Sequence, residues 1–239
     1  MIEYRFIKDN VLIKAFLPKG GRRNIIYAPG LPQYIDKRHE LVQQFTALGC
    51  NLFVPVYTGT YESDGNFTLK NSVSSLEKAA DLVKSGHAES LYDFADIKWS
   101  PSVPYIVGFS YGALPALLQK TSADGILLIC PFVAMSLHET SQYGENIHTT
   151  LDFLMRAYQN TYRFNKNDLI SELKNISLPQ EIKNLFIVYS SEDPSIPLEE
   201  IQWLRNKYQC EAYDKKGSHS ASVGKEIFEQ IFYSSPAKV

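Results

Sequence analysis

Residues 104–114 read PYIVGFSYGAL, and this stretch decides the fold. It contains a Gly-x-Ser-x-Gly motif, Gly108-Phe109-Ser110-Tyr111-Gly112, between an apolar run and the helix-like segment ALPALLQK. A serine in such a sharp strand-to-helix turn adopts a strained backbone, and a side chain at either glycine would collide with the neighbouring strand or helix. The turn lifts the serine Oγ above the carboxyl edge of the sheet, so Ser110 is a candidate nucleophile.

Short apolar runs rich in Ile, Val and aromatic residues recur along the chain. Such runs are typical of strands that are buried on both faces of a parallel sheet. They are NIIYAP (24–29), NLFVPVY (51–57), PYIVGFS (104–110), GILLICPF (125–132) and NLFIVYS (184–190). The first residues differ, because EYRFIK and VLIKAFLP alternate and meet at Asp9-Asn10, which predicts an N-terminal β-hairpin.

Helical periods separate the apolar runs. Asp36 is expected to cap a helix that ends at Gly49, and a second helix ends at Gly86. Pro197 is expected at the first position of a later helix, and a last helix covers 223–231. Because strands and helices alternate, the sequence predicts an α/β protein with a mainly parallel sheet and helices on both sides.

Residues 133–183 interrupt this alternation. They make up about 50 residues without a strand signal, whereas a simple connection needs far fewer. Within them, the apolar spacing from Ile147 to Tyr158 predicts a helix of about four turns, and 168–174 predicts a shorter one. We therefore predict that 133–183 is a helical lid inserted into a single domain that spans 1–239.

The elbow resembles that of the α/β-hydrolase family, in which the catalytic residues follow the order serine, acid, histidine. After the 184–190 run, SEDPSIP (191–197) resembles the family's acid loop, in which an aspartate is followed three residues later by an aliphatic residue and then by proline. GSHS (217–220), before the last helix, matches the family's histidine position. The resemblance implies a sheet of about eight strands and a triad of Ser110, Asp193 and His219. Taken singly, Asp193 also suits a turn and His219 a solvated loop; their order and positions together favour the triad.

The resemblance also implies an oxyanion hole built from two backbone N–H groups. Tyr111, directly after the nucleophile, would supply one of them. Leu31, in the loop 28–32 after the first buried run, would supply the other. The family often has His-Gly in this loop where this chain has Pro29-Gly30, so a plain Pro-Gly turn is the alternative for Leu31.

A second loop of the family matches in part. Many members have Gly-x-Gly-x-Ser-x-Gly after the strand that 51–57 resembles, and Gly59, Ser63 and Gly65 fit this pattern. Tyr61 replaces the second glycine, and the Asp-x-Arg that usually precedes the loop is missing here. The loop is therefore interpreted either as support for the floor of the site or as a polar surface loop.

Composition excludes several classes of partner. The 239 residues include 24 Lys plus Arg and 26 Asp plus Glu, a net charge of −2, so no general field favours nucleic acid or anionic lipid. No run reaches the roughly 18 apolar residues that span a bilayer, and MIEYRFIKDN lacks the apolar core of a secretory signal.

Cys50, Cys130 and Cys210 are expected to be free, mostly buried thiols, and no Cys or His spacing suits a metal. We expect a cytoplasmic protein with no metal, no cofactor and a small acyl substrate; the oligomeric state stays open.

These residues predict a serine hydrolase that cleaves a carboxylic ester, or a thioester, of a small molecule through an acyl-enzyme intermediate. The tyrosine in GFSYGA is similar to that of prolyl-oligopeptidase-type peptidases, so a peptidase or amidase is one alternative. A catalytically silent ligand-binding protein of the same fold is another, although all three candidate triad members are present. Haloalkane dehalogenation is disfavoured, because that reaction needs a carboxylate where this chain has Ser110.

Overall fold

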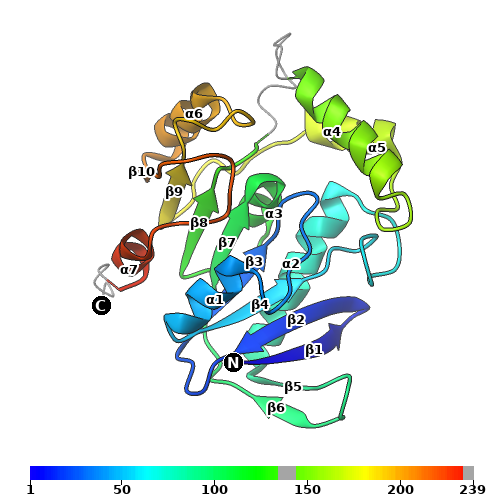
Figure 1. The fold of residues 1–239 in the computed structure, drawn as a ribbon, viewed down its shortest axis with the longest axis vertical. Helices are drawn as coiled ribbons and strands as arrows, with labels where there is room; N and C mark the ends of the chain where they lie inside the picture. Colours follow the sequence, from blue (N-terminus) through cyan, green and yellow to red (C-terminus); the bar gives the residue numbers. More distant parts are fainter. Residues whose placement is uncertain (134–143, 234–239) are drawn as a thin grey trace.

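The computed structural model describes residues 1–133 and 144–233 (Figure 1). In this part of the chain an eight-stranded sheet has the order β1-β2-β4-β3-β7-β8-β9-β10. Its strands are β1 (Ile2–Lys8), β2 (Val11–Leu17), β3 (Arg23–Ala28), β4 (Cys50–Pro55), β7 (Tyr105–Phe109), β8 (Gly125–Ile129), β9 (Leu185–Tyr189) and β10 (Glu211–Asp214). β2 pairs antiparallel with β1 and β4, and all other pairs are parallel. The predicted α/β fold with a mainly parallel sheet is confirmed.

The N-terminal hairpin is also confirmed. β1 and β2 meet at Asp9 and Asn10, whose φ angles are 47° and 65°. Two consecutive left-handed residues match the type I′ turn that suits the twist of a two-residue hairpin, and Asp and Asn tolerate this conformation better than most residues.

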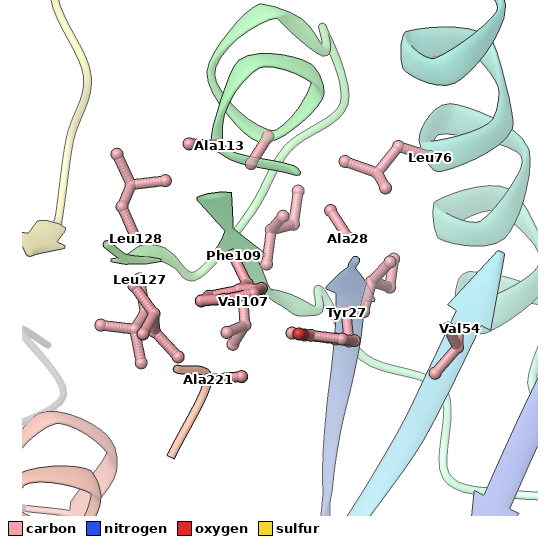
Figure 2. Close-up of a cluster of buried hydrophobic side chains, with 14 of the residues drawn as sticks. Tyr27, Ala28, Val54, Leu76, Val107, Phe109, Ala113, Leu127, Leu128 and Ala221 are labelled. Atoms are coloured by element: carbon pink, nitrogen blue, oxygen red, sulfur yellow. The ribbon is translucent and has the colours of Figure 1, made fainter. Parts of the chain in front are cut away.

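Helices cover both faces of the sheet. They are α1 (Glu40–Ala47), α2 (Leu69–Ser85), α3 (Ala113–Leu118), α6 (Leu198–Tyr208) and α7 (Lys225–Tyr233). α2 and α3 lie together on one face (Figure 2). On the opposite face, the ring of Phe45 in α1 lies 4.7 Å from that of Phe228 and 5.9 Å from that of Phe232, both in α7. This aromatic cluster joins the C-terminal helix to an early part of the chain.

Two predicted helix starts are wrong in detail. Asp36 does not cap α1, because its carboxylate instead accepts a hydrogen bond from Arg38 N (2.7 Å) within the preceding turn. His39 is the N-cap residue of α1. Pro197 is the N-cap residue of α6 rather than its first helical residue, and its extended ψ of 142° leads the chain into the helix.

The core explains why the strand sequences are continuously apolar (Figure 2). Successive residues of a strand point to opposite faces, so a central parallel strand needs apolar side chains on both. Tyr27, Val107 and Leu127 lie on the face that also receives Ala221. Ala28 and Leu128 lie on the other face, toward α2 and α3. All of these side chains are buried.

The connection between β8 and β9 holds two helices, α4 (Gly144–Ala157) and α5 (Lys166–Lys174), and both predicted helices are therefore present. Figure 1 shows them side by side at one end of the molecule. Residues 134–143 of the predicted lid lie outside the described residues. The assignment of 133–183 as a lid within one domain stays a prediction.

A backbone junction attaches this connection to the loop after β4. Arg163 N donates to Gly59 O (2.8 Å), Phe67 N donates to Arg163 O (2.6 Å), and Tyr61 N donates to Thr161 O (2.8 Å). Gly59 has a φ of +84°, and a Cβ there would lie 2.0 Å from the backbone nitrogen of Phe67. The partial match of this loop to a glycine-containing pattern thus has a local cause, because only glycine allows the two ends of the loop, at residues 59 and 66–67, to approach so closely.

A short hairpin was not predicted. β5 (His87–Glu89) and β6 (Asp96–Lys98) pair antiparallel outside the main sheet. Each has three residues, none of them buried, so neither produces an apolar period. None of the helices in the described residues is long and apolar enough to cross a membrane.

Candidate active site

Ser110 lies at the end of β7, in the turn that the motif predicts. Its φ is 50°, a left-handed conformation that is strained for a serine. A Cβ on Gly108 would lie 2.6 Å from Gly112 O, and a Cβ on Gly112 would lie 2.0 Å from Ala28 O. Both glycines are therefore required by backbone atoms that cannot move aside, as the elbow interpretation predicts.

His219 and Asp193 come together from two loops at the same edge of the sheet. His219 Nδ1 donates to Asp193 Oδ2 at 2.7 Å. The other carboxylate oxygen accepts from Ser195 N (2.8 Å) and Ile196 N (3.2 Å), and the Asp193 side chain is 2% exposed. Burial raises the pKa of Asp193, but the hydrogen bond from His219 and those from the backbone lower it more, so the net pKa lies below its ordinary value. Asp193 is thus an ionised, fully hydrogen-bonded carboxylate that fixes one nitrogen of His219.

Ser110 lies close to the hydrogen-bonded pair of His219 and Asp193. The ring of Phe109, directly before Ser110, lies 5.0 Å from the imidazole of His219. Phe132 N, just after β8, donates to Ser110 O at 3.1 Å. Ser110, Asp193 and His219 therefore gather at the carboxyl ends of β7 to β10, in the order and at the positions that the sequence indicates.

Lys215 holds the loop that carries His219. Its side chain is buried, and its Nζ donates to Ser220 O (2.7 Å), Ser220 Oγ (2.8 Å) and more weakly to Ser218 O (3.4 Å). Ser190 Oγ donates to Gly217 O in the same loop. An ammonium group that satisfies acceptors on both sides of His219 restricts the backbone there. The sequence offers no signal for this role, because Lys215 is the first of two lysines after a short strand and either could face solvent.

The loop that contains Leu31 packs directly against the elbow. A Cβ on Gly30 would lie 2.8 Å from the ring of Phe109 and 3.1 Å from the Cβ of Ser110. This close approach places the backbone of Gly30 beside the nucleophile candidate. The role of the Leu31 N–H stays a prediction. Glycine at position 30 thus leaves room for the ring of Phe109.

Tyr111 is buried, and its hydroxyl group lies 3.0 Å from Ser72 Oγ in α2. It is the second residue of the short 3-10 helix Ser110–Gly112, which α3 continues. The first N–H groups of a helix have no acceptor within it. The buried side chain thus fixes the residue that directly follows Ser110 at the start of a helix, and the role of its N–H in an oxyanion hole stays a prediction.

Cys130 lies next to Asp193. From the sequence alone, Cys130 is expected only to be a buried thiol. A ligand atom from each of Cys130, Asp193 and His219 lies within 4.8 Å of the other two, which is the spacing of a possible metal-ligand group. Burial raises the pKa of the Cys130 thiol to about 12, and Asp193 adds to this effect while Lys215 opposes it. A protonated thiol next to a carboxylate that is already bonded to histidine suits an acid–histidine pair better than a metal centre.

A narrow cavity of about 20 Å³, enough for one water molecule, lies beside the 29–35 loop. Gly30, Tyr61, Tyr162 and the buried side chain of Lys14 are among the residues that line it, and Ser110 and His219 are not. Burial lowers the pKa of Lys14 to about 8. Its Nζ donates to Ile35 O (3.2 Å), so Lys14 supports the far end of the same loop.

No protein-family model and no curated protein matches the chain. Solved structures do. Est1E from Butyrivibrio proteoclasticus, with ferulic acid bound, has a TM-score of 0.63 at 15% identity and covers 95% of each chain. Alpha/beta hydrolase domain-containing protein 10 from mouse has a TM-score of 0.62 at 17% identity, over 97% of this chain and 96% of that one. A bromoperoxidase from Bacillus anthracis has a TM-score of 0.63 at 13% identity, over 91% and 93% of the two chains.

The strand order, the elbow and these similarities show that the chain has the α/β-hydrolase fold, as the sequence resemblance implied. At such low identity the similarity establishes the fold and not the chemistry.

Proposed function

We propose that this chain is a serine hydrolase that cleaves a carboxylic ester of a small molecule. Ser110 Oγ attacks the carbonyl carbon, and the Nε2 of neutral His219 accepts the hydroxyl proton. His219 then returns that proton to the leaving alcohol, which leaves an acyl group on Ser110. Water, activated by the same imidazole, releases the acid and regenerates the serine.

Asp193 and two backbone amides complete the proposed mechanism. Because Asp193 accepts the proton on Nδ1, the Nε2 of a neutral His219 is left free to act as the base. The carboxylate also stabilises the imidazolium that forms when the proton moves. The N–H groups of Leu31 and Tyr111 stabilise the oxygen that gains negative charge in the tetrahedral intermediate.

One observation carries the proposal: a buried carboxylate orients a histidine at 2.7 Å beside a serine held in a strained turn. A strained backbone costs about 1–3 kcal/mol and persists where the surroundings impose it, as the contacts of Gly108 and Gly112 do here. Serine favours acyl transfer, because its oxygen attacks carbonyl carbon and the resulting ester can be hydrolysed. The neighbour Est1E holds ferulic acid, a carboxylic acid, which supports acyl chemistry on this fold.

Hydrolysis of p-nitrophenyl esters with acyl chains of increasing length, assayed beside aminoacyl anilides, tests the proposal. We expect turnover of esters in preference to anilides. Ser110→Ala should lower kcat by at least about 10³-fold, because it removes the nucleophile. Ser171→Ala, which changes an exposed serine on α5, is the matched control and should keep the wild-type rate.

Three results contradict the proposal. Faster turnover of the anilides than of the esters would instead indicate a peptidase or amidase. Absence of turnover by a folded wild-type chain, or equal rates for wild type and Ser110→Ala, would remove the support for hydrolysis at this serine.

A further inference from the structure

Gln33 lies at the centre of the loop that faces the elbow. Its side-chain Oε1 accepts two hydrogen bonds, from the hydroxyl of Tyr27 (2.8 Å) and from the backbone N–H of Gly30 (3.1 Å). Tyr27 is fully buried in β3, so one of these donors belongs to the rigid sheet and the other to the loop. The glutamine therefore connects the loop to the core.

The amide nitrogen of Gln33 completes the connection. Its Nε2 lies 2.9 Å from Nε2 of His39, the N-cap residue of α1. Burial lowers the pKa of His39, which favours the neutral ring. A neutral ring that accepts the amide proton at Nε2 carries its own proton on Nδ1, so Nδ1 does not at the same time accept from Leu41 N, which lies 3.3 Å away. Because Oε1 already faces two donors, the orientation of the amide is determined and Gln33 links β3, the loop and α1.

Two further side chains bind the backbone of the loop. Tyr57, buried after β4, donates through its hydroxyl to Pro29 O (3.0 Å). Lys14 donates to Ile35 O at the other end. Tyr57 and Gln33 thus hold the carbonyl and the N–H of one peptide unit, Pro29–Gly30, which lies close to Ser110.

The hydrogen bond from Gly30 to Gln33 also bears on which backbone N–H can serve as the second donor of the oxyanion hole. The Gly30 N–H is used by Gln33, so it does not face the reacting carbonyl. The next N–H along the chain is that of Leu31, the predicted second donor of the oxyanion hole. A donor must sit within a few tenths of an ångström of the developing oxyanion to act, so the position of this backbone matters for rate.

We propose that Gln33 is the positioning residue of the oxyanion loop: by holding the Gly30 N–H and the buried Tyr27 hydroxyl together, it aims the Leu31 N–H at the oxygen of the tetrahedral intermediate. This inference rests on the proposed hydrolase function. Gln33 does not touch the substrate, and its effect acts through the backbone of Gly30 and Leu31.

Gln33→Met keeps the length of the side chain but removes both the acceptor and the donor. Because loss of one oxyanion donor costs about 10²–10³-fold in kcat, we expect a displaced donor to lower kcat by about 10- to 100-fold. KM should change by less than about 3-fold, since the interaction develops in the transition state. Inhibition by an arylboronic acid, whose tetrahedral serine adduct places an oxygen in the same hole, should weaken by a factor similar to the loss of kcat.

The controls separate positioning from general stability. Gln43→Met makes the same change at an exposed position on α1 and should keep the wild-type kcat. Tyr27→Phe removes one of the two donors but leaves the bond from Gly30, so its kcat should fall less than that of Gln33→Met. If Gln33→Met does not fold, Gln33→Asn, which keeps the amide but is too short to bridge both donors, should show the same loss of kcat.

Amide hydrogen exchange of Gly30 measures the connection without any assay of activity. The Gly30 amide should be protected in the wild type and exchange at least about 10-fold faster in Gln33→Met. Unchanged exchange, or a kcat for Gln33→Met within about twofold of that of Gln43→Met, overturns the inference. A wild type that hydrolyses no ester but shows the expected exchange difference would contradict the proposed function while leaving the connection made by Gln33 in place.

Discussion

At the scale of single residues, the site depends on groups whose hydrogen-bonding capacity is filled before any substrate arrives. Asp193 accepts from His219, Ser195 and Ile196, and Lys215 donates to acceptors on both sides of His219. A buried charge is tolerated when such partners are present and is costly when they are not. The same bonds that make these charges tolerable therefore fix the geometry that the proposed mechanism needs.

Asp193→Asn tests the role of the carboxylate in activity. The amide can donate to Nδ1 of His219, which leaves the proton on Nε2 and so produces the wrong tautomer for a base. We expect kcat for ester hydrolysis to fall by about 10⁴-fold while the fold is retained. A variant that keeps more than a tenth of the wild-type kcat would contradict the assignment of Asp193 as the acid.

The same variant gives a pH dependence of stability. The pKa of Asp193 in the folded chain lies below its ordinary value of about 3.9, so ionisation stabilises the folded state above that pH. This contribution is lost as the pH falls through the folded-state pKa. Urea unfolding at pH 7 and pH 3 should show a larger decrease in the free energy of unfolding for the wild type than for Asp193→Asn. Asp124→Asn, at an exposed aspartate, is the matched control and should behave as the wild type does.

Sequence reasoning found the residues with a motif and missed those without one. Ser110 and its two glycines were predictable, because backbone contact leaves few other residue types possible in that turn. Gln33 and Lys215 were not, because a glutamine in a loop and a lysine after a strand are usually solvated. Their roles depend on which buried group happens to face them, and that is determined by tertiary packing.

At the scale of elements, hydrogen bonds attach the described part of the connection between β8 and β9 to the rest of the fold. Its backbone pairs with the loop after β4 through Arg163. In addition, Leu69 N, at the first residue of α2, donates to Glu172 Oε2 in α5 at 2.7 Å. A carboxylate at a helix N-terminus satisfies an unpaired N–H and interacts favourably with the helix dipole.

Glu172→Ala removes this contact between α5 and α2. We expect the free energy of unfolding to fall by about 1 kcal/mol, measured by urea denaturation at pH 7. Glu181→Ala changes an exposed glutamate in the same connection and should alter stability by less than about 0.5 kcal/mol. Equal effects of the two substitutions would show that the α5–α2 contact contributes nothing measurable.

Strands and long helices were predictable from periodicity, and their ends were less so. The run GILLICPF (125–132) gave β8, and the pattern that ends at Gly86 gave α2, because burial on one or two faces leaves a clear apolar period. The start of α1 was misplaced, since Asp36 and His39 both precede the helix and only the local turn decides which of them caps it. The hairpin β5–β6 left no signal, because its six residues pack little.

At the scale of the whole molecule, the parallel strands explain why distant residues meet. The carboxyl ends of β3, β7, β9 and β10 lie along one edge of the sheet, and each is followed by one part of the candidate site. The sequence predicts which segments are strands and hence that these loops share an edge. It does not by itself give the lateral order, in which β4 lies outside β3, because pairing between distant strands leaves no local pattern.

Reaction of the purified chain with a fluorophosphonate, followed by peptide mass spectrometry, tests the nucleophile assignment most directly. A serine activated by histidine attacks phosphorus and displaces fluoride, which leaves a covalent adduct on Oγ. We predict one adduct per chain, on the peptide that contains Ser110, and none on Ser110→Ala. No adduct on a folded wild-type chain, or an adduct that persists in Ser110→Ala, would contradict the assignment of Ser110 as the nucleophile.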